Sequence, residues 1–136
     1  MNLPPRLATV AVKNGVSLGL LGEADRGLVL ALAASTLEPG REFLEADVND
    51  MLLAWLDGAG AMLRVDHVEL RRWLVDAGFM TRDGFGRAYV RGPAETSRAV
   101  ALLGVCTASD LAGAVAALRA AKAAKRESKR LAYADR

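Results

Sequence analysis

The sequence contains a single cysteine and a single histidine, and this scarcity excludes several kinds of functional site. Cys106 cannot form an internal disulfide, and we interpret it as a small buried side chain in the apolar run AVALLGVC. His67 is the only histidine, so a metal site made of several histidines is impossible. A mixed site of Asp66, His67 and Glu69 is disfavoured, because side chains at adjacent positions of a helix start do not converge on one metal ion. We therefore predict no metal and no cofactor.

The chain also lacks the motifs of common enzyme classes. It contains no Gly-x-Gly-x-x-Gly after a strand, no P-loop, no nucleophile elbow and no Cys-x-x-Cys pair. Asp-Gly-Phe-Gly at 83–86 is similar to a kinase motif, but 136 residues are far too few for a kinase and the context is a hairpin. We therefore predict that the protein is not an enzyme.

Long hydrophobic runs are missing as well. The longest, such as Leu28 to Ala34, are too short to span a bilayer. Pro4, Pro5 and Lys13 interrupt the N-terminus before a secretory apolar segment can build up, so we expect a cytoplasmic protein with no membrane partner. A composition of 52% hydrophobic and 25% charged residues predicts a folded chain, and its net charge of +2 is nearly neutral.

Residues 24–92 carry the clearest structural pattern. A first helix is predicted from about Ala24, and Pro39-Gly40 ends it. Its residues at helical spacing are Leu28, Ala31, Leu32 and Ser35. A second helix is predicted from about Glu45 until Gly58 and Gly60 break it. Its inward stripe consists of Val48, Leu52, Trp55 and Leu56.

The third helix has clearly marked ends. Asp66 is a good N-cap, Glu69 completes a capping box, and Gly78 is expected to stop the helix in the left-handed conformation. The predicted inward residues are Leu70, Trp73, Leu74 and Ala77. A β-hairpin follows, with strands at 79–82 and 88–91 around a glycine-rich turn. Three helices followed by a hairpin predict a mainly α, winged-helix-type domain.

The segments before and after this domain, residues 1–23 and 93–136, show different patterns. Residues 1–23 have no definite predicted structure, because Pro4 and Pro5 are expected to exclude an early regular element and 7–13 fits a strand or a helix. Residues 93–136 are predicted as a C-terminal helical extension with a basic end. It comprises a short apolar helix at 95–104 and a long helix, capped by Thr107 or Ser109, that runs to about Tyr133.

The segments PGREFLEADVNDMLLAW and DHVELRRWLVDAGFMTRDGFGRAYVR resemble a bacterial family of small domains of unknown function. Members of this family occur alone or attached to helix-turn-helix transcriptional regulators. The residues that carry the resemblance are Glu45, Val48, Asn49, Asp66, His67, Leu70, Arg71, Arg72, Leu74, Val75, Asp76, Gly78, Arg82, Asp83, Gly86 and Tyr89. The resemblance implies a winged-helix-like fold and a regulatory role, and it implies no catalytic or ligand-binding residues.

Basic residues of the third helix and the hairpin are the first candidate contacts for nucleic acid. Recognition helices and wings use such side chains to reach phosphates or bases. The candidates are His67, Arg71 and Arg72 on the helix and Arg82 and Arg87 on the hairpin.

A structural alternative is a set of ion pairs that neutralises these arginines. Residues 64–91 contain six arginines and four acidic residues, so their net charge is only modestly positive for a segment that binds DNA. The pairs are Arg72 with Asp76, Arg71 with Asp47 or Asp50, and Arg87 with Asp83.

The long C-terminal helix changes character along one face. Leu111, Val115 and Leu118 form an apolar stripe that fits docking on protein. The same face then becomes basic, with Lys122, Lys125, Arg126, Lys129 and Arg130. This pattern is typical of a helix that projects into a polyanion; a solvated charged tail and a dimerising helix are the alternatives, although the stripe is short for a coiled coil.

Together these patterns predict a non-enzymatic nucleic-acid-binding protein, a regulator whose partner is DNA or a structured RNA such as ribosomal RNA. The third helix, the wing and the basic C-terminal helix would contact the phosphate backbone. The alternative is a protein-interaction or dimerisation module of the same fold, whose partner is another protein or a second copy of the chain.

Overall fold

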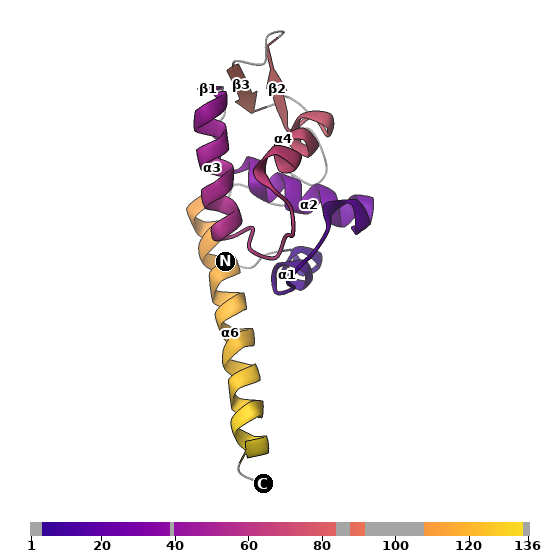
Figure 1. Ribbon diagram of the computed structural model, residues 1–136, viewed down its shortest axis with the longest axis vertical. Helices are drawn as coiled ribbons and strands as arrows, with labels where there is room; N and C mark the ends of the chain where they lie inside the picture. Colours follow the sequence, from indigo (N-terminus) through magenta and orange to yellow (C-terminus); the bar gives the residue numbers. More distant parts are fainter. Residues whose placement is uncertain (1–3, 39, 84–87, 92–107, 135–136) are drawn as a thin grey trace.

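A computed structural model describes residues 4–38, 40–83, 88–91 and 108–134, which form a mainly helical protein with one small antiparallel sheet. This confirms the predicted fold class (Figure 1). The helices are α1 (Pro5–Ala11), the 3-10 turn η1 (Leu18–Leu20), α2 (Glu23–Ala34), α3 (Glu45–Asp57), α4 (His67–Asp76) and α6 (Ala108–Ala134). The strands are β1 (Glu42–Leu44), β2 (Met80–Arg82) and β3 (Ala88–Arg91).

The sheet has the order β1-β3-β2, with both neighbouring pairs antiparallel. β2 and β3 are the predicted hairpin, in which Arg82 lies opposite Tyr89. β1 was not predicted, because it is only three residues long and buries one side chain, Phe43. The chain order α2-β1-α3-α4-β2-β3 is compatible with a winged-helix-like arrangement.

Helix α2 forms the centre of the core. Every residue from Leu28 to Ala34 is buried, so the helix is covered on all sides rather than along the single predicted stripe. A helix that is apolar all round is stable only when its surroundings exclude water on every face. Both α1 and α4 pack on α2 and supply this cover.

The ends of α4 follow the sequence prediction. The Asp66 carboxylate accepts a hydrogen bond from the backbone N–H of Glu69 at 2.8 Å, as an N-cap does. At the other end Gly78 has φ +83°, and the N–H of Phe79 donates to the carbonyl of Leu74 at 2.8 Å. This bond is typical of a Schellman ending, which requires the left-handed residue that glycine provides.

One inward residue of α4 was predicted wrongly. Leu70 and Leu74 are fully buried, but Ala77 is exposed because the helix has ended and Ala77 is its C-cap. Trp73 is half-buried, and the Arg26 guanidinium lies 4.9 Å from its ring centroid. The inward stripe of this short helix is therefore narrower than predicted.

Gly78→Ala is expected to lower the free energy of unfolding by about 1–2 kcal/mol, because an L side chain is strained in the left-handed region. Gly113→Ala is the matched control: the site is inside α6, and apart from the neighbouring backbone of that helix no described atom lies within 4 Å of the position its Cβ would take. There the same change is expected to stabilise by roughly 0.5–1 kcal/mol. Urea denaturation of both variants measures the difference, and equal effects would contradict this account of the helix end.

The expectation that two prolines exclude an early element was wrong. Helix α1 begins at Pro5, and a proline at the first helical position loses nothing because its missing N–H has no partner there. Leu7, Val10 and Ala11 of this helix are buried in the same core as α2. The segment before α2 therefore contributes to the core through α1.

Some predictions fall outside the described residues. They are the helix at 95–104, the Thr107 cap, the burial of Cys106 and the pairing of Arg87 with Asp83. Ser109 lies inside α6 rather than before it, since the helix begins at Ala108.

Candidate nucleic-acid interface

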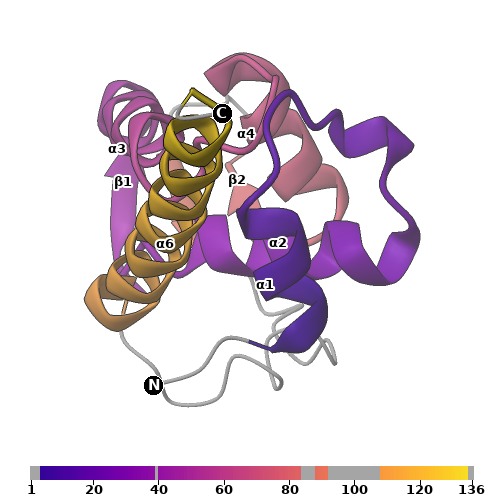
Figure 2. The same ribbon diagram turned by 90° about the horizontal axis from the view of Figure 1, so that it is seen from below.

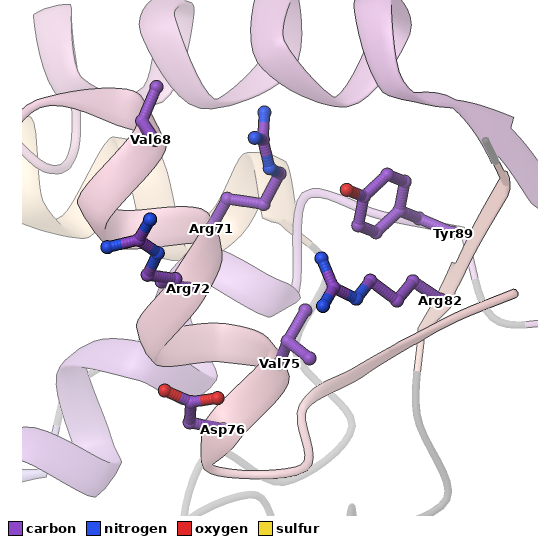
Figure 3. A pocket seen from close by; sticks show the side chains of 7 residues that line it. All are labelled: Val68, Arg71, Arg72, Val75, Asp76, Arg82 and Tyr89. Atoms are coloured by element: carbon purple, nitrogen blue, oxygen red, sulfur yellow. The ribbon is translucent and has the colours of Figure 1, made fainter. Parts of the chain in front are cut away.

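A pocket of about 320 Å³ lies between α4 and the sheet, and three of the predicted arginines line it. Figure 3 shows that Arg82 of β2 and Tyr89 of β3 reach from the sheet toward α4. The side chain of Arg71 points from α4 toward α3, and the guanidinium of Arg82 lies between Tyr89 and Val75 (Figure 3). The complete lining is Val68, Arg71, Arg72, Val75, Asp76, Arg82 and Tyr89.

Arg71 is held by two residues of α3. Its Nη1 donates to the side-chain oxygen of Asn49, and its Nη2 lies 3.1 Å from a carboxylate oxygen of Glu45. The guanidinium also lies 5.8 Å from the centroid of the Tyr89 ring. The side chain is only 17% exposed, so Arg71 joins α4 to α3 and the sheet instead of extending into solvent.

The alternative prediction, an ion pair between Arg71 and an acid of the second helix, is correct for the helix (α3) but wrong for the acid. Glu45 and Asn49 are four residues apart and share one face of α3, whereas Asp47 and Asp50 lie on other faces. The Tyr89 hydroxyl also lies 3.4 Å from Glu45. Arg71, Glu45, Asn49 and Tyr89 thus form one connected cluster, the Arg71 cluster, and all four belong to the family pattern. The sequence signal for it is the Glu-x-x-x-Asn spacing, which places Glu45 and Asn49 on one face of a helix.

Arg72 and Arg82 differ from Arg71. Both are exposed, and neither makes an ion pair or hydrogen bond with any residue that the structure describes. The predicted pair of Arg72 with Asp76 is not formed, although both side chains border the pocket. These two arginines carry charge that the described part of the protein leaves uncompensated.

His67 is the first residue of α4, directly after the Asp66 cap, and it is half-buried. It does not line the pocket. Arg87 lies outside the described residues.

Helix α6 docks on α1 through the predicted apolar stripe and through a polar contact that was not predicted. Leu111 and Val115 are buried. Arg119 donates from Nη1 to the backbone carbonyls of Ala11 and Lys13, at 3.0 and 2.9 Å. Carbonyls at a helix C-terminus lack partners within the helix and favour a cation, so Arg119 satisfies the end of α1.

Lys122 belongs to this docking contact rather than to an exposed surface. Its Nζ donates to the carbonyl of Val12 at 3.1 Å, and the side chain is half-buried. Arg119 adds a bond from Nη2 to the side-chain oxygen of Asn14 at 2.7 Å. Arg119 was not predicted, because its partners lie more than a hundred residues away in the sequence.

The basic helix face, defined here as Lys125, Arg126, Lys129 and Arg130, begins where the docking contact ends. All four side chains are exposed. Arg130 pairs with Glu127 at 2.6 Å, and this guanidinium lowers the pKa of the Glu127 carboxyl below its usual value. Glu127 therefore stays ionised near neutral pH and compensates Arg130, which leaves Lys125, Arg126 and Lys129 without an acidic partner among the described residues.

The pocket and the basic helix face lie at opposite ends of the molecule. In Figure 1 the sheet is at the top, and the C-terminal half of α6 extends below the rest of the protein. Figure 2, seen from below, shows α6 rising from the domain toward the viewer. With 27 residues α6 is about 40 Å long, so the predicted contacts form two separate surfaces.

Within the described ranges, no three histidine, cysteine, aspartate or glutamate side chains are grouped closely enough to hold a metal ion. Among the same residues, no helix combines the length and the apolarity that crossing a membrane requires.

Comparisons with curated proteins and with solved structures gave no match. A family model described as "Uncharacterized protein conserved in bacteria (DUF2087)" matches residues 22–91. The matched range runs from the start of α2 to the end of β3, and so includes the sheet, the Arg71 cluster and the pocket but neither α1 nor α6. The chain therefore belongs to this bacterial family of uncharacterized proteins.

Proposed function

We propose that the protein binds nucleic acid through its phosphates, with the basic helix face as the main contact. One observation carries the proposal: Lys125, Arg126 and Lys129 are exposed, lack an acidic partner in the described structure, and share one side of a helix that extends beyond the domain. Cations placed in this way release counterions from a nucleic acid when they contact its phosphates. Docking by Arg119 and Lys122 fixes the direction in which this part of α6 points.

Arg72 and Arg82 extend the same chemistry to the opposite end of the molecule. Both are exposed, and no described residue neutralises them. In a winged-helix-like arrangement they belong to the recognition helix and the wing, which are the elements that face DNA. A regulator that acts on DNA is one form of this function, and a protein that binds structured RNA is the other.

A second function, binding of a protein partner, is favoured by a different observation. Leu131 and Tyr133 in the last turns of α6 are 52% and 71% exposed. Large apolar side chains near a helix end fit a protein interface better than a phosphate backbone. The two residues lie about 200° apart around the helix, so a partner that covered both would have to enclose the end of α6.

The salt dependence of binding distinguishes the two functions. Titration of the full chain into a fluorescent duplex DNA and a hairpin RNA is expected to show affinity falling by about 40-fold from roughly 50 to 200 mM salt, for three phosphate contacts. Comparison of the two nucleic acids identifies the preferred one. If neither is bound at about 50 mM salt, nucleic-acid binding is abandoned in favour of a protein partner.

A further inference from the structure

We propose that the pocket between α4 and the sheet binds the phosphate group of a small, hydroxyl-bearing phosphomonoester. The proposal goes beyond nucleic-acid binding by the basic helix face, because the two surfaces lie at opposite ends of the molecule. The pocket volume of about 320 Å³ is at the lower end of the range for small-molecule sites. It is large enough for a phosphorylated sugar and too small for an extended polymer.

The charge of the pocket fits an anion. Arg71 of α4 and Arg82 of β2 both line the pocket; the Arg71 guanidinium is turned toward α3, and the Arg82 guanidinium lies between Tyr89 and Val75 (Figure 3). Arg82 has no ion pair or hydrogen bond within the described residues. Arg71 contacts Glu45 and Asn49 through its two terminal nitrogens, and a guanidinium has further N–H donors for a ligand. A phosphate placed between the two arginines would receive charge-assisted hydrogen bonds from both.

Part of the site is already fixed in position. Arg71 is held from two sides, and the Tyr89 side chain beside it is 1% exposed. Side chains that are ordered before a ligand arrives lose little conformational entropy when it binds. Arg82 is exposed whereas Arg71 is enclosed, so of these two arginines Arg82 is the one that would close on the phosphate.

The other lining residues select the rest of the ligand. Asp76 offers a carboxylate that accepts hydrogen bonds, and it suits hydroxyl groups beside the phosphate while repelling a second anion. Val68 and Val75 provide apolar walls. A monoester presents a free phosphate end that can enter a recess, whereas a backbone diester has a sugar on each side.

Ribose 5-phosphate, inorganic phosphate and ribose are suitable probes for calorimetric titration of the full chain. We expect saturable binding of ribose 5-phosphate, weaker binding of inorganic phosphate, and none of ribose. Arg82→Gln is expected to weaken ribose 5-phosphate binding by at least about tenfold, because a hydrogen bond between charged groups is lost. Arg64→Gln is the charge-matched control, since Arg64 is exposed and outside the pocket, and it is expected to have no effect.

Val75→Phe fills the pocket without changing its charge and is also expected to abolish binding, with thermal melting as the check that the variant folds. The proposal is overturned if ribose 5-phosphate does not bind by about 10 mM, or if Arg82→Gln and Arg64→Gln weaken it equally. It is also overturned if only a duplex DNA, and no small phosphate, depends on Arg82. The Lys125→Gln/Arg126→Gln/Lys129→Gln variant is expected to keep ribose 5-phosphate binding, so this test is independent of nucleic-acid binding by the basic helix face.

Discussion

Val115→Asp is expected to release α6 from α1 while the α2–β3 region stays folded. Val115 is completely buried at the docking contact, beside the buried Leu111. An unpaired carboxylate there would cost on the order of 3 kcal/mol or more, so the helix is expected to undock instead of burying the charge. Hydrogen exchange of the backbone amides measures this: exchange in α6 should accelerate by about a hundredfold or more, and exchange in α4 should change little.

The control for this variant is Ala116→Asp, the adjacent residue. Ala116 is exposed, so the same charge on the same helix stays in water and docking should persist. Unchanged protection of α6 in Val115→Asp would show that the apolar stripe does not hold the helix. If hydrogen exchange in α6 accelerated in both variants, the cause would be the lower helix propensity of aspartate and not the burial of its charge.

Lys125→Gln/Arg126→Gln/Lys129→Gln is expected to weaken nucleic-acid binding by about a hundredfold or more near 50 mM salt. The three cations lack acidic partners in the described structure, so their removal leaves no unpaired carboxylate behind. Glutamine is a good helix former, and α6 should stay helical by circular dichroism. Fluorescence anisotropy with the nucleic acid that the wild-type protein prefers gives the affinity.

The matched control for that variant is Lys13→Gln/Arg41→Gln/Arg64→Gln. These three residues are exposed and lie outside both the pocket and the basic helix face, and their replacement changes the net charge by the same amount. Equal losses of affinity in the two variants would mean that only the total charge of the protein matters.

The local structure of this protein was largely predictable from its sequence. The ends of α4 follow from Asp66 and Gly78, because a cap and a left-handed glycine act within one turn. The hairpin and the helical structure of α6 also follow from nearby residues. β1 was not predicted, because three residues with one buried side chain carry too little pattern. α1 was not predicted, because proline interrupts most regular elements but is tolerated at the first position of a helix, where Pro5 stands.

The contacts between distant segments could not be predicted in the same way. Nothing near Arg119 in the sequence indicates that it satisfies the carbonyls at the end of α1. The partners of Arg71 depend on which face of α3 turns toward α4, and Glu45 with Asn49 occupy that face instead of the predicted aspartates. Only the three-dimensional arrangement distinguishes Arg71, which is enclosed, from Arg82, which is exposed.

The most direct measurement of the proposed function is the slope of log affinity against log salt for the wild-type protein and the two triple variants. Each phosphate contact to duplex DNA contributes about 0.9 to this slope. We expect Lys125→Gln/Arg126→Gln/Lys129→Gln to lower the magnitude of the slope by roughly 2.7, and Lys13→Gln/Arg41→Gln/Arg64→Gln to keep the wild-type slope. An identical slope in all three proteins would contradict nucleic-acid binding by the basic helix face.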